Sequence, residues 1–105
     1  MRHIKEDYTD VAKEIYRQLG KKALYMMGMK HVSSSDEKMG ALNIRFTGSK
    51  KCNHVKIVLN FQDTYDITFY KIRGMDYKII AEYEDIYVDQ LHDIIESETG
   101  LYLSL

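Results

Sequence analysis

Two stretches near the middle of the chain, residues 40–47 and 54–61, alternate between apolar and polar residues over most of their length. Successive side chains of a β-strand point to opposite faces, so this alternation predicts two half-buried strands. The apolar positions, which we expect to face a core, are Leu42, Ile44, Phe46, Val55, Ile57, Leu59 and Phe61. Asn60 falls on the polar face of the pattern, and the polar residues 48–53 predict a hairpin loop.

Two further strands follow along the chain. In residues 65–70, Tyr65, Ile67 and Phe69 share one face, and the pattern breaks near Lys71 and Ile72, which predicts a bulge or the end of the strand. Residues 74–76 read as a turn, and residues 77–81 predict a last strand. Because the connections are short, we expect neighbouring strands to be antiparallel.

Apolar residues at helical spacing predict one helix near each end of the chain. The first covers residues 7–19, and its apolar stripe consists of Tyr8, Val11, Ala12, Ile15 and Leu19. The second covers residues 85–97, and Asp85 is expected to be its N-cap. The apolar stripe of this second helix consists of Tyr87, Val88, Leu91, Ile94 and Ile95.

The segments between the first helix and the strands are short. Residues 23–27 are apolar, which favours a buried strand and leaves a second helical turn as the alternative. Residues 29–39 are polar, which predicts an exposed loop. The full order predicts an α+β fold in a single domain, 1–105. We expect a two-layer sandwich in which an antiparallel sheet of four to five strands is flanked by an N-terminal and a C-terminal helix.

Composition narrows the class of protein. The chain has 105 residues, of which 45% are hydrophobic and 30% charged, as in ordinary globular domains. A helix needs about 20 consecutive apolar residues to cross a bilayer, and no apolar run in the sequence approaches this length. The first residues lack the apolar region that we would expect of a signal peptide. The one cysteine, Cys52, has no partner for an internal disulfide. We therefore expect a cytoplasmic protein without membrane contact.

Charge is distributed unevenly along the chain. Residues 1–60 contain 12 Lys and Arg against 6 Asp and Glu, whereas residues 61–105 contain 3 against 10. Within the second predicted helix, the acids expected on one stripe are Asp85, Asp89, Asp93 and Glu96. Such a stripe is either a solvated helix face or a docking surface for a basic protein partner. We favour docking of a protein partner as the functional hypothesis.

The alternative hypothesis is a nucleic-acid interface. The cations on the polar face of the two central strands and in their hairpin loop are Arg45, Lys50, Lys51 and Lys56. A basic sheet face with nearby tyrosines can contact phosphates and stack bases. An overall isoelectric point near 6.4 weighs against this alternative, because dedicated nucleic-acid binders are far more basic.

Signatures of catalysis are missing from the sequence. The glycines do not form a phosphate-binding loop, and no Gly-x-Ser-x-Gly motif occurs. Cys52 and His54 have the spacing of two ligands on one strand, but a metal site needs three or four ligands. We therefore expect a non-enzymatic protein without catalytic residues, metal or cofactor.

Several segments resemble a family of small uncharacterised proteins encoded in bacteriophages, prophages and other bacterial mobile elements. These segments are Gln-Leu-Gly at 18–20, Met-Met-Gly at 26–28, Asp-Thr-Tyr-Asp-Ile at 63–67, Lys-Ile-Arg-Gly at 71–74, Tyr-Lys at 77–78, Val-Asp-Gln-Leu at 88–91 and Thr-Gly-Leu-Tyr-Leu-Ser-Leu at 99–105. The resemblance covers nearly the whole chain. It implies an accessory protein in the cytoplasm of a bacterial host cell, and it implies no activity.

The sequence also bears on self-association. An antiparallel sheet of this size has two open edges, and the apolar tail formed by residues 101–105 adds surface that one small body covers poorly. We therefore expect a homodimer rather than a strict monomer.

Overall fold

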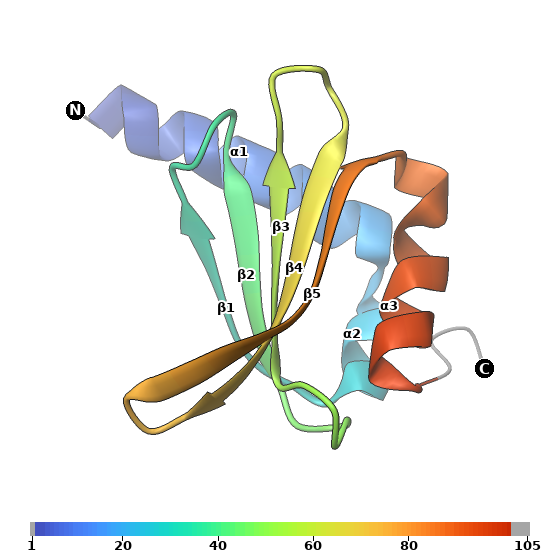
Figure 1. Ribbon diagram of the computed structural model, residues 1–105. Coiled ribbons are helices and arrows are strands. Elements are labelled where there is room, and N and C mark those ends of the chain that lie inside the picture. Colours follow the sequence, from blue (N-terminus) through green and yellow to red (C-terminus); the bar gives the residue numbers. More distant parts are fainter. Residues whose placement is uncertain (1, 102–105) are drawn as a thin grey trace.

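The structure is a computed structural model that describes residues 2–101, with side chains described from Asp10 onward. The elements are α1 (Arg2–Leu19), α2 (Lys21–Met27), β1 (Met29–Ser35), β2 (Ala41–Phe46), β3 (His54–Leu59), β4 (Tyr65–Arg73), β5 (Asp76–Ile86), the 3₁₀ turn η1 (Val88–Gln90) and α3 (Leu91–Thr99). The five strands form one antiparallel sheet in the order β1-β2-β3-β4-β5 (Figure 1). The predicted α+β class, with an antiparallel sheet flanked by N- and C-terminal helices, is therefore confirmed.

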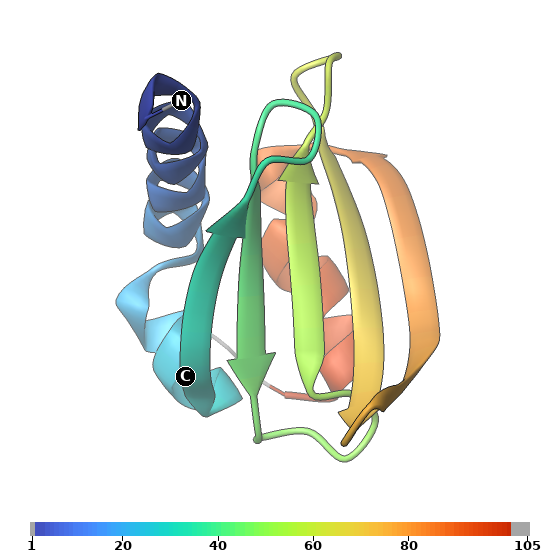
Figure 2. The same ribbon diagram turned by 90° about the vertical axis from the view of Figure 1, so that its left-hand side faces the viewer.

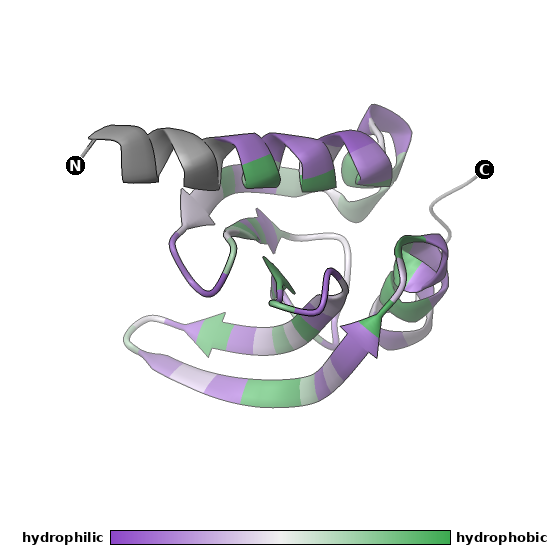
Figure 3. Ribbon diagram, turned by 90° about the horizontal axis from the view of Figure 1, so that it is seen from above, coloured by the Kyte–Doolittle hydropathy of each residue, from purple (hydrophilic) through white to green (hydrophobic). Residues whose placement is uncertain are grey.

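The helices lie on one face of the sheet (Figures 2 and 3). We call this the inner face and the opposite one the outer face. Apolar side chains of the strands and helices meet between the two layers, and Ile15, Ile57, Ile67 and Ile95 are completely buried there. Of the predicted core positions, Phe61, Tyr87 and Val88 are exposed, and Val11, Leu59 and Ile94 are only partly buried. The other described core positions are buried on both layers. The alternation of strands and the helical stripes therefore assigned most of the inner face correctly.

Residues 23–27 belong to a helix, so the favoured strand was wrong and its helical alternative was right. Three side chains of α2 are buried at helical spacing, namely Ala23, Leu24 and Met27. Gly20 with φ 87° and Gly28 with φ 73° limit the helix at its two ends. A run of seven apolar and basic residues is too short for periodicity alone to distinguish helix from strand.

Residues 29–35 form strand β1, so the predicted loop was wrong at this point. β1 is an edge strand, and its backbone pairs with β2 from Met29 to Ser35. Its serine side chains lack apolar alternation because one side of an edge strand is open to solvent. Only Met29 and Val32 pack against the core, which left little hydrophobic signal in the sequence.

The turn after β3 reverses the predicted positions of two side chains. The strand ends at Leu59, and Asn60 then turns inward and is 5% exposed, whereas Phe61 is 75% exposed. The side-chain oxygen of Asn60 accepts hydrogen bonds from the backbone N–H groups of Gln62 and Thr64. The buried amide thus organises the turn, and this need outweighs the alternation pattern.

The second predicted helix begins later than expected. β5 continues to Ile86, so Asp85 lies in the strand with φ 56° and is not an N-cap. Tyr87 and Val88 are 65% and 49% exposed, so the apolar stripe begins only at Leu91. The extension is held by the pairing of Ile67 with the β5 residue Tyr83. The predicted apolar tail lies outside the described residues, apart from Leu101, which packs against the core.

Candidate functional site

The hairpin formed by β4 and β5, the two longest strands, extends beyond the two layers of the fold. Its far half, residues 70–80, bends away from the helices on the outer side of the sheet (Figures 1 and 3). We call this segment the arm. Lys71 lies directly opposite Lys78 in the strand register, and Arg73 lies opposite Asp76. Residues opposite each other in a sheet share a face, so one face of the arm carries three cations and one acid.

The loop between β2 and β3 is fastened to the arm. The side-chain amide of Asn53 donates to the backbone oxygen of Ile72 over 2.8 Å, and the Ile72 N–H donates back to the Asn53 side-chain oxygen over 2.8 Å. The Lys71 ammonium donates to the backbone oxygen of Lys50 over 3.1 Å. These contacts hold the loop that carries Lys50 and Lys51 next to Lys71 of the arm. We call the combined surface the basic arm site: Lys50, Lys51, Lys71, Arg73 and Lys78.

The basic arm site is open to solvent. A shallow groove of about 290 Å³ runs along it, lined by Lys71, Arg73, Asp76, Tyr77 and Lys78. Among the described residues, no ion pair joins any of its five cations to an acid. Lys71 and Lys78 repel each other in their paired positions, since like charges directly opposite are destabilising. The surface thus gathers positive charges that form no direct ion pair with a described acid.

The other face of the arm is aromatic and apolar. It carries Tyr70, Ile72, Tyr77 and Ile79, because Tyr70 pairs with Ile79 and Ile72 pairs with Tyr77. The rings of Tyr70 and Tyr77 meet edge to face at 6.0 Å, and Tyr70 meets His54 of β3 at 5.5 Å. This face therefore continues the outer face of the sheet.

The four cations predicted to bind nucleic acid are divided between two places. Lys50 and Lys51 belong to the basic arm site, whereas Arg45 and Lys56 lie on the outer face. Lys56 forms a 2.9 Å ion pair with Glu37, and its ammonium lies 5.9 Å from the centre of the Tyr70 ring. The predicted basic sheet face is therefore not one continuous surface.

Histidine 54 lies between the two outer-face cations. Burial lowers the pKa of His54, and the positive charges of Lys56 and Arg45 lower it further. The imidazole is consequently biased towards its neutral form, and it adds little positive charge to the outer face.

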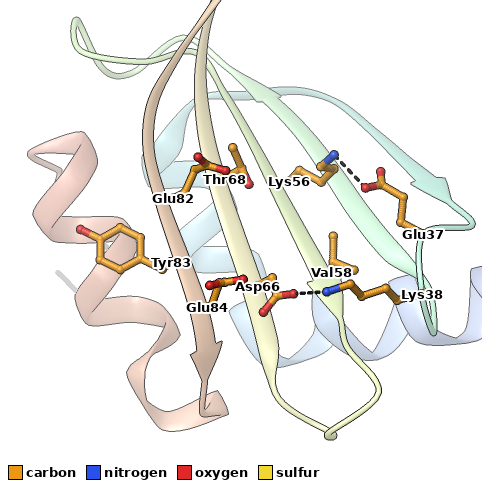
Figure 4. A pocket seen from close by; sticks show the side chains of 9 residues that line it. All are labelled: Glu37, Lys38, Lys56, Val58, Asp66, Thr68, Glu82, Tyr83 and Glu84. Carbon is orange, nitrogen blue, oxygen red and sulfur yellow. Dashed lines mark hydrogen bonds and ion pairs between the residues drawn. The ribbon is translucent and has the colours of Figure 1, made fainter.

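A pocket of about 400 Å³ occupies the opposite end of the outer face (Figure 4). It is lined by Glu37, Lys38, Lys56, Val58, Asp66, Thr68, Glu82, Tyr83 and Glu84. Both lysines are held by carboxylates, Lys56 by Glu37 and Lys38 by Asp66, the latter over 2.7 Å. Glu82 and Glu84 remain exposed beside them. Acids thus outnumber cations, which makes this pocket unfavourable for phosphate.

The pocket is braced by a hydrogen-bonded turn. Burial alone would raise the pKa of Asp66. Hydrogen bonds donated by Lys38, by the Asn60 amide and by the backbone N–H of Asp85 outweigh this effect, so the pKa of Asp66 lies below its ordinary value. The Asp85 carboxylate accepts from Asn60 over 3.1 Å and from Thr64 over 3.2 Å. Asp85 therefore has a structural contact that the sequence did not indicate.

The predicted acidic stripe is only partly assembled. Asp85 lies in β5, Asp89 lies in η1, and Asp93 and Glu96 lie in α3. Asp89 and Asp93 are exposed and form no hydrogen bond or ion pair with the described side chains. Helical spacing therefore joins Asp89, Asp93 and Glu96, and Asp85 stands apart from them.

Cys52 is completely buried, and burial raises the pKa of its thiol. A raised pKa disfavours the thiolate, which is the reactive form. Within the part of the chain that the structure describes, no three His, Cys, Asp or Glu side chains gather where they could hold a metal ion.

Comparison of the chain with protein-family models, with curated proteins and with solved structures gives no match. Among the helices that the structure describes, none is long and apolar enough to cross a membrane.

Sequence reasoning missed three cations of the basic arm site, namely Lys71, Arg73 and Lys78. The signal was present, since these are the only Lys and Arg residues among residues 61–105 and they fall within one hairpin. It was hidden because the seven acids from Glu82 to Glu98 dominate the charge of this half. Lys71, Arg73 and Lys78 come close to the loop of Lys50 and Lys51 only through the pairing of β4 with β5 and the hydrogen bonds between the loop and the arm.

Proposed function

We propose that this protein is a non-enzymatic nucleic-acid-binding protein, and that the basic arm site holds the phosphate backbone. The observation that carries the proposal is the fixed proximity of Lys71, Lys78 and the Lys50 loop on one exposed surface. The groove along the arm is lined by three of these cations and by one acid, Asp76. A polyanion relieves their mutual repulsion and releases its own counterions, and both effects favour binding.

The shape of the arm also supports a nucleic-acid ligand. A two-stranded β-ribbon fits a groove of duplex DNA, and other proteins use such ribbons to contact grooves. The arm extends past the core, so its tip can approach a groove without collision by the rest of the molecule (Figure 1). Met75 at the tip is fully exposed, and Tyr77 on the aromatic face of the arm is 66% exposed. Apolar and aromatic tips of this kind pack against bases or sugars.

The test measures the salt dependence of binding to a short labelled DNA duplex, with single-stranded DNA and RNA as parallel ligands. Neutralising the paired lysines in Lys71→Gln with Lys78→Gln should reduce affinity about tenfold or more at low salt. The slope of log K against log salt should fall by about 2, since each phosphate contact contributes about 0.9 for duplex DNA.

The matched control is Lys21→Gln with Lys22→Gln, which removes the same charge from exposed positions on α2. This control changes the net charge without touching the arm, so it should leave affinity nearly unchanged. Equal losses in the two double variants would contradict a site on the arm, as would wild-type protein that is not retained by any of the three nucleic acids.

A second candidate is the protein-docking surface predicted from the acids. Asp89 and Asp93 favour it, because both are exposed without a partner among the described side chains. A basic protein would dock there. Asp89→Lys with Asp93→Lys should then remove a partner that is captured from a bacterial lysate after nuclease treatment. Lys71→Gln with Lys78→Gln should retain that partner.

The cellular setting of either function follows from the resemblance described above. A phage or mobile-element accessory protein in a bacterial cytoplasm encounters nucleic acid at high concentration. Such a setting suits binding with modest affinity that depends on charge. Expression of the gene during prophage induction, followed by crosslinking to nucleic acid, is the measurement that tests this setting.

A further inference from the structure

The outer face of the sheet has no covering layer. All three helices lie on the inner face, so the polar side of β1 to β5 and the aromatic face of the arm remain open (Figures 2 and 3). On the arm, Ile72, Tyr77 and Ile79 are 37%, 66% and 45% exposed on the side that continues this face. Clustered apolar exposure beside polar residues is typical of interaction surfaces.

Charge on the outer face is arranged by strand register. Nearest the arm, Arg45 of β2 lies opposite His54 of β3, and no acid pairs with it in the register. Towards the other end of the strands, Glu82 lies opposite Thr68, and Glu84 lines the pocket together with Asp66. The face therefore has a positive end on β2 and a negative end on β5.

Internal ion pairs sharpen this polarity. Lys56 is paired with Glu37, and Lys38 is paired with Asp66, so these four charges largely neutralise one another. Arg45 at one end, with Glu82 and Glu84 at the other, have no ion pair among the described side chains. What remains for a partner is one positive and one negative region on the same surface.

We propose that the outer face binds a second copy of this chain in an isologous dimer. A two-fold axis that lies in the interface, midway between Arg45 and Glu84, brings Arg45 of each copy to Glu84 of the other. A surface with one positive and one negative end is then complementary to itself. A partner of uniform charge would meet like charge at one of the two ends.

Size and shape agree with this occupant. Five strands about 4.8 Å apart, each 6 to 11 residues long at about 3.3 Å per residue, give the outer face an area of the same order as the roughly 800 Å² per partner of a stable interface. The arm bends to the outer side, where its apolar face would cover the edge of the second copy (Figure 3). The arm cations Lys71, Arg73 and Lys78 lie on the opposite face of the arm, so the dimer leaves them exposed to nucleic acid.

The experiment is a charge exchange followed by sedimentation equilibrium at micromolar concentration. Arg45→Glu and Glu84→Lys, each alone, should raise the dimer dissociation constant about tenfold or more, because each places like charges together twice per dimer. Arg45→Glu combined with Glu84→Lys exchanges the two charges and should restore the dissociation constant to within about threefold of wild type. Tyr77→Ser with Ile79→Ser should also weaken the dimer.

The controls are Lys22→Glu on α2 and Asp93→Lys on α3, which make the same charge changes on the helical layer. Both should leave the dimer intact. A wild-type species that stays at 12.4 kDa would overturn the proposal. So would single variants no weaker than their controls, or a combined variant whose losses add and do not cancel. Lys71→Gln with Lys78→Gln should keep the dimer while it loses nucleic acid, so the two proposals can fail separately.

Discussion

Single side chains decide how the turns of this molecule are made, and Asn60 is the clearest case. Its buried side chain accepts from two backbone N–H groups of its own turn and donates to Asp66 over 3.0 Å and to Asp85 over 3.1 Å. One amide thereby joins the ends of β3, β4 and β5. The alternation of the strand placed Asn60 outside because a periodic pattern contains no information about hydrogen bonds within a turn.

We expect Asn60→Ala to lower the free energy of unfolding by about 1–3 kcal/mol, because it leaves buried polar groups without partners. Denaturant titration measures the loss. Gln62→Ala, an exposed change in the same turn, is the control and should cost about 0.5 kcal/mol or less. Equal costs for the two variants would show that the Asn60 side chain does not hold the turn.

His54 predicts a pH effect on stability. Its folded pKa lies below the ordinary 6.5 because of burial, with Lys56 and Arg45 adding to the shift. The unfolded chain therefore binds a proton first as the pH falls below 6.5. The contribution of His54 is fully present above that pH and is lost progressively towards the folded pKa.

Consequently, His54→Gln should flatten the decrease in unfolding free energy just below pH 6.5. Urea titrations at a series of pH values measure the difference between the variant and wild type. His31→Gln on the exposed face of β1 controls for the loss of a histidine. If the two variants follow the same curve, the environment of His54 is not the cause.

Among the secondary-structure elements, the arm depends on the hydrogen bonds that join it to the β2–β3 loop, which we call the clamp. Asn53 makes two reciprocal hydrogen bonds with the backbone of Ile72, and these bonds are the side-chain contacts that join the loop to the arm, together with Lys71. Few buried contacts hold the far half of the hairpin, since Ile72, Met75 and Tyr77 are all exposed. Such an element opens locally at low cost in free energy.

Asn53→Ala should therefore speed amide hydrogen exchange in the arm, beginning at Ile72, while the amides of β2 and β3 keep their protection. Exchange followed by NMR measures this. Asn43→Ala is the matched control, because Asn43 is also half-buried and, among the described residues, its side chain donates a hydrogen bond to Ser35 and none to the arm. A uniform rise in exchange throughout the sheet would mean that the clamp affects global stability, which contradicts a local role.

How much of the fold the sequence predicts depends on whether each strand buries one face. Strands β2, β3 and β4 were predicted because one face of each is buried, and burial on one face produces alternation. β1 was missed because an edge strand needs no apolar alternation, and the start of α3 was misplaced because Asp85 is an equally good N-cap and turn residue. Local pattern fails where distant contacts decide.

Prediction of the candidate site was limited for the same reason. The sequence named Lys50 and Lys51 correctly as loop cations, and both belong to the basic arm site. It could not add Lys71 and Lys78, since only cross-strand register places them opposite each other. The sequence analysis placed Arg45 and Lys56 on the same surface as the loop lysines, because no pattern in the chain reveals that Lys56 forms an ion pair with Glu37.

At the scale of the whole molecule, the two charged halves of the sequence do not form two charged faces. Cations of the first half meet those of the arm at one end of the hairpin, while the outer face carries both signs. A dimer through the outer face would display two basic arm sites related by the two-fold axis. Two linked sites on one nucleic acid bind with greater avidity than either alone.

The sheet that carries both surfaces, the basic arm site and the outer face, packs on one hydrophobic core, and Ile57 lies at the centre of this core. Ile57 of the middle strand is completely buried and pairs with Leu42 on one side and Ile67 on the other. Ile57→Ala should lower the free energy of unfolding by about 2–5 kcal/mol, which approaches the whole stability of a small domain. Val88→Ala shortens an apolar side chain that is 49% exposed on η1, away from the outer face, and should cost about 0.5 kcal/mol or less.

Two probes decide whether the layers unfold together. Far-ultraviolet circular dichroism follows helices and strands, and tyrosine fluorescence follows side chains such as Tyr65, which lies in the core and bonds to Gln18 of α1. If residues 1–105 form one domain, the two midpoints coincide in wild type and shift together in Ile57→Ala. Separate midpoints would divide the chain into independent units, and a loss below about 1 kcal/mol would contradict the central position of Ile57.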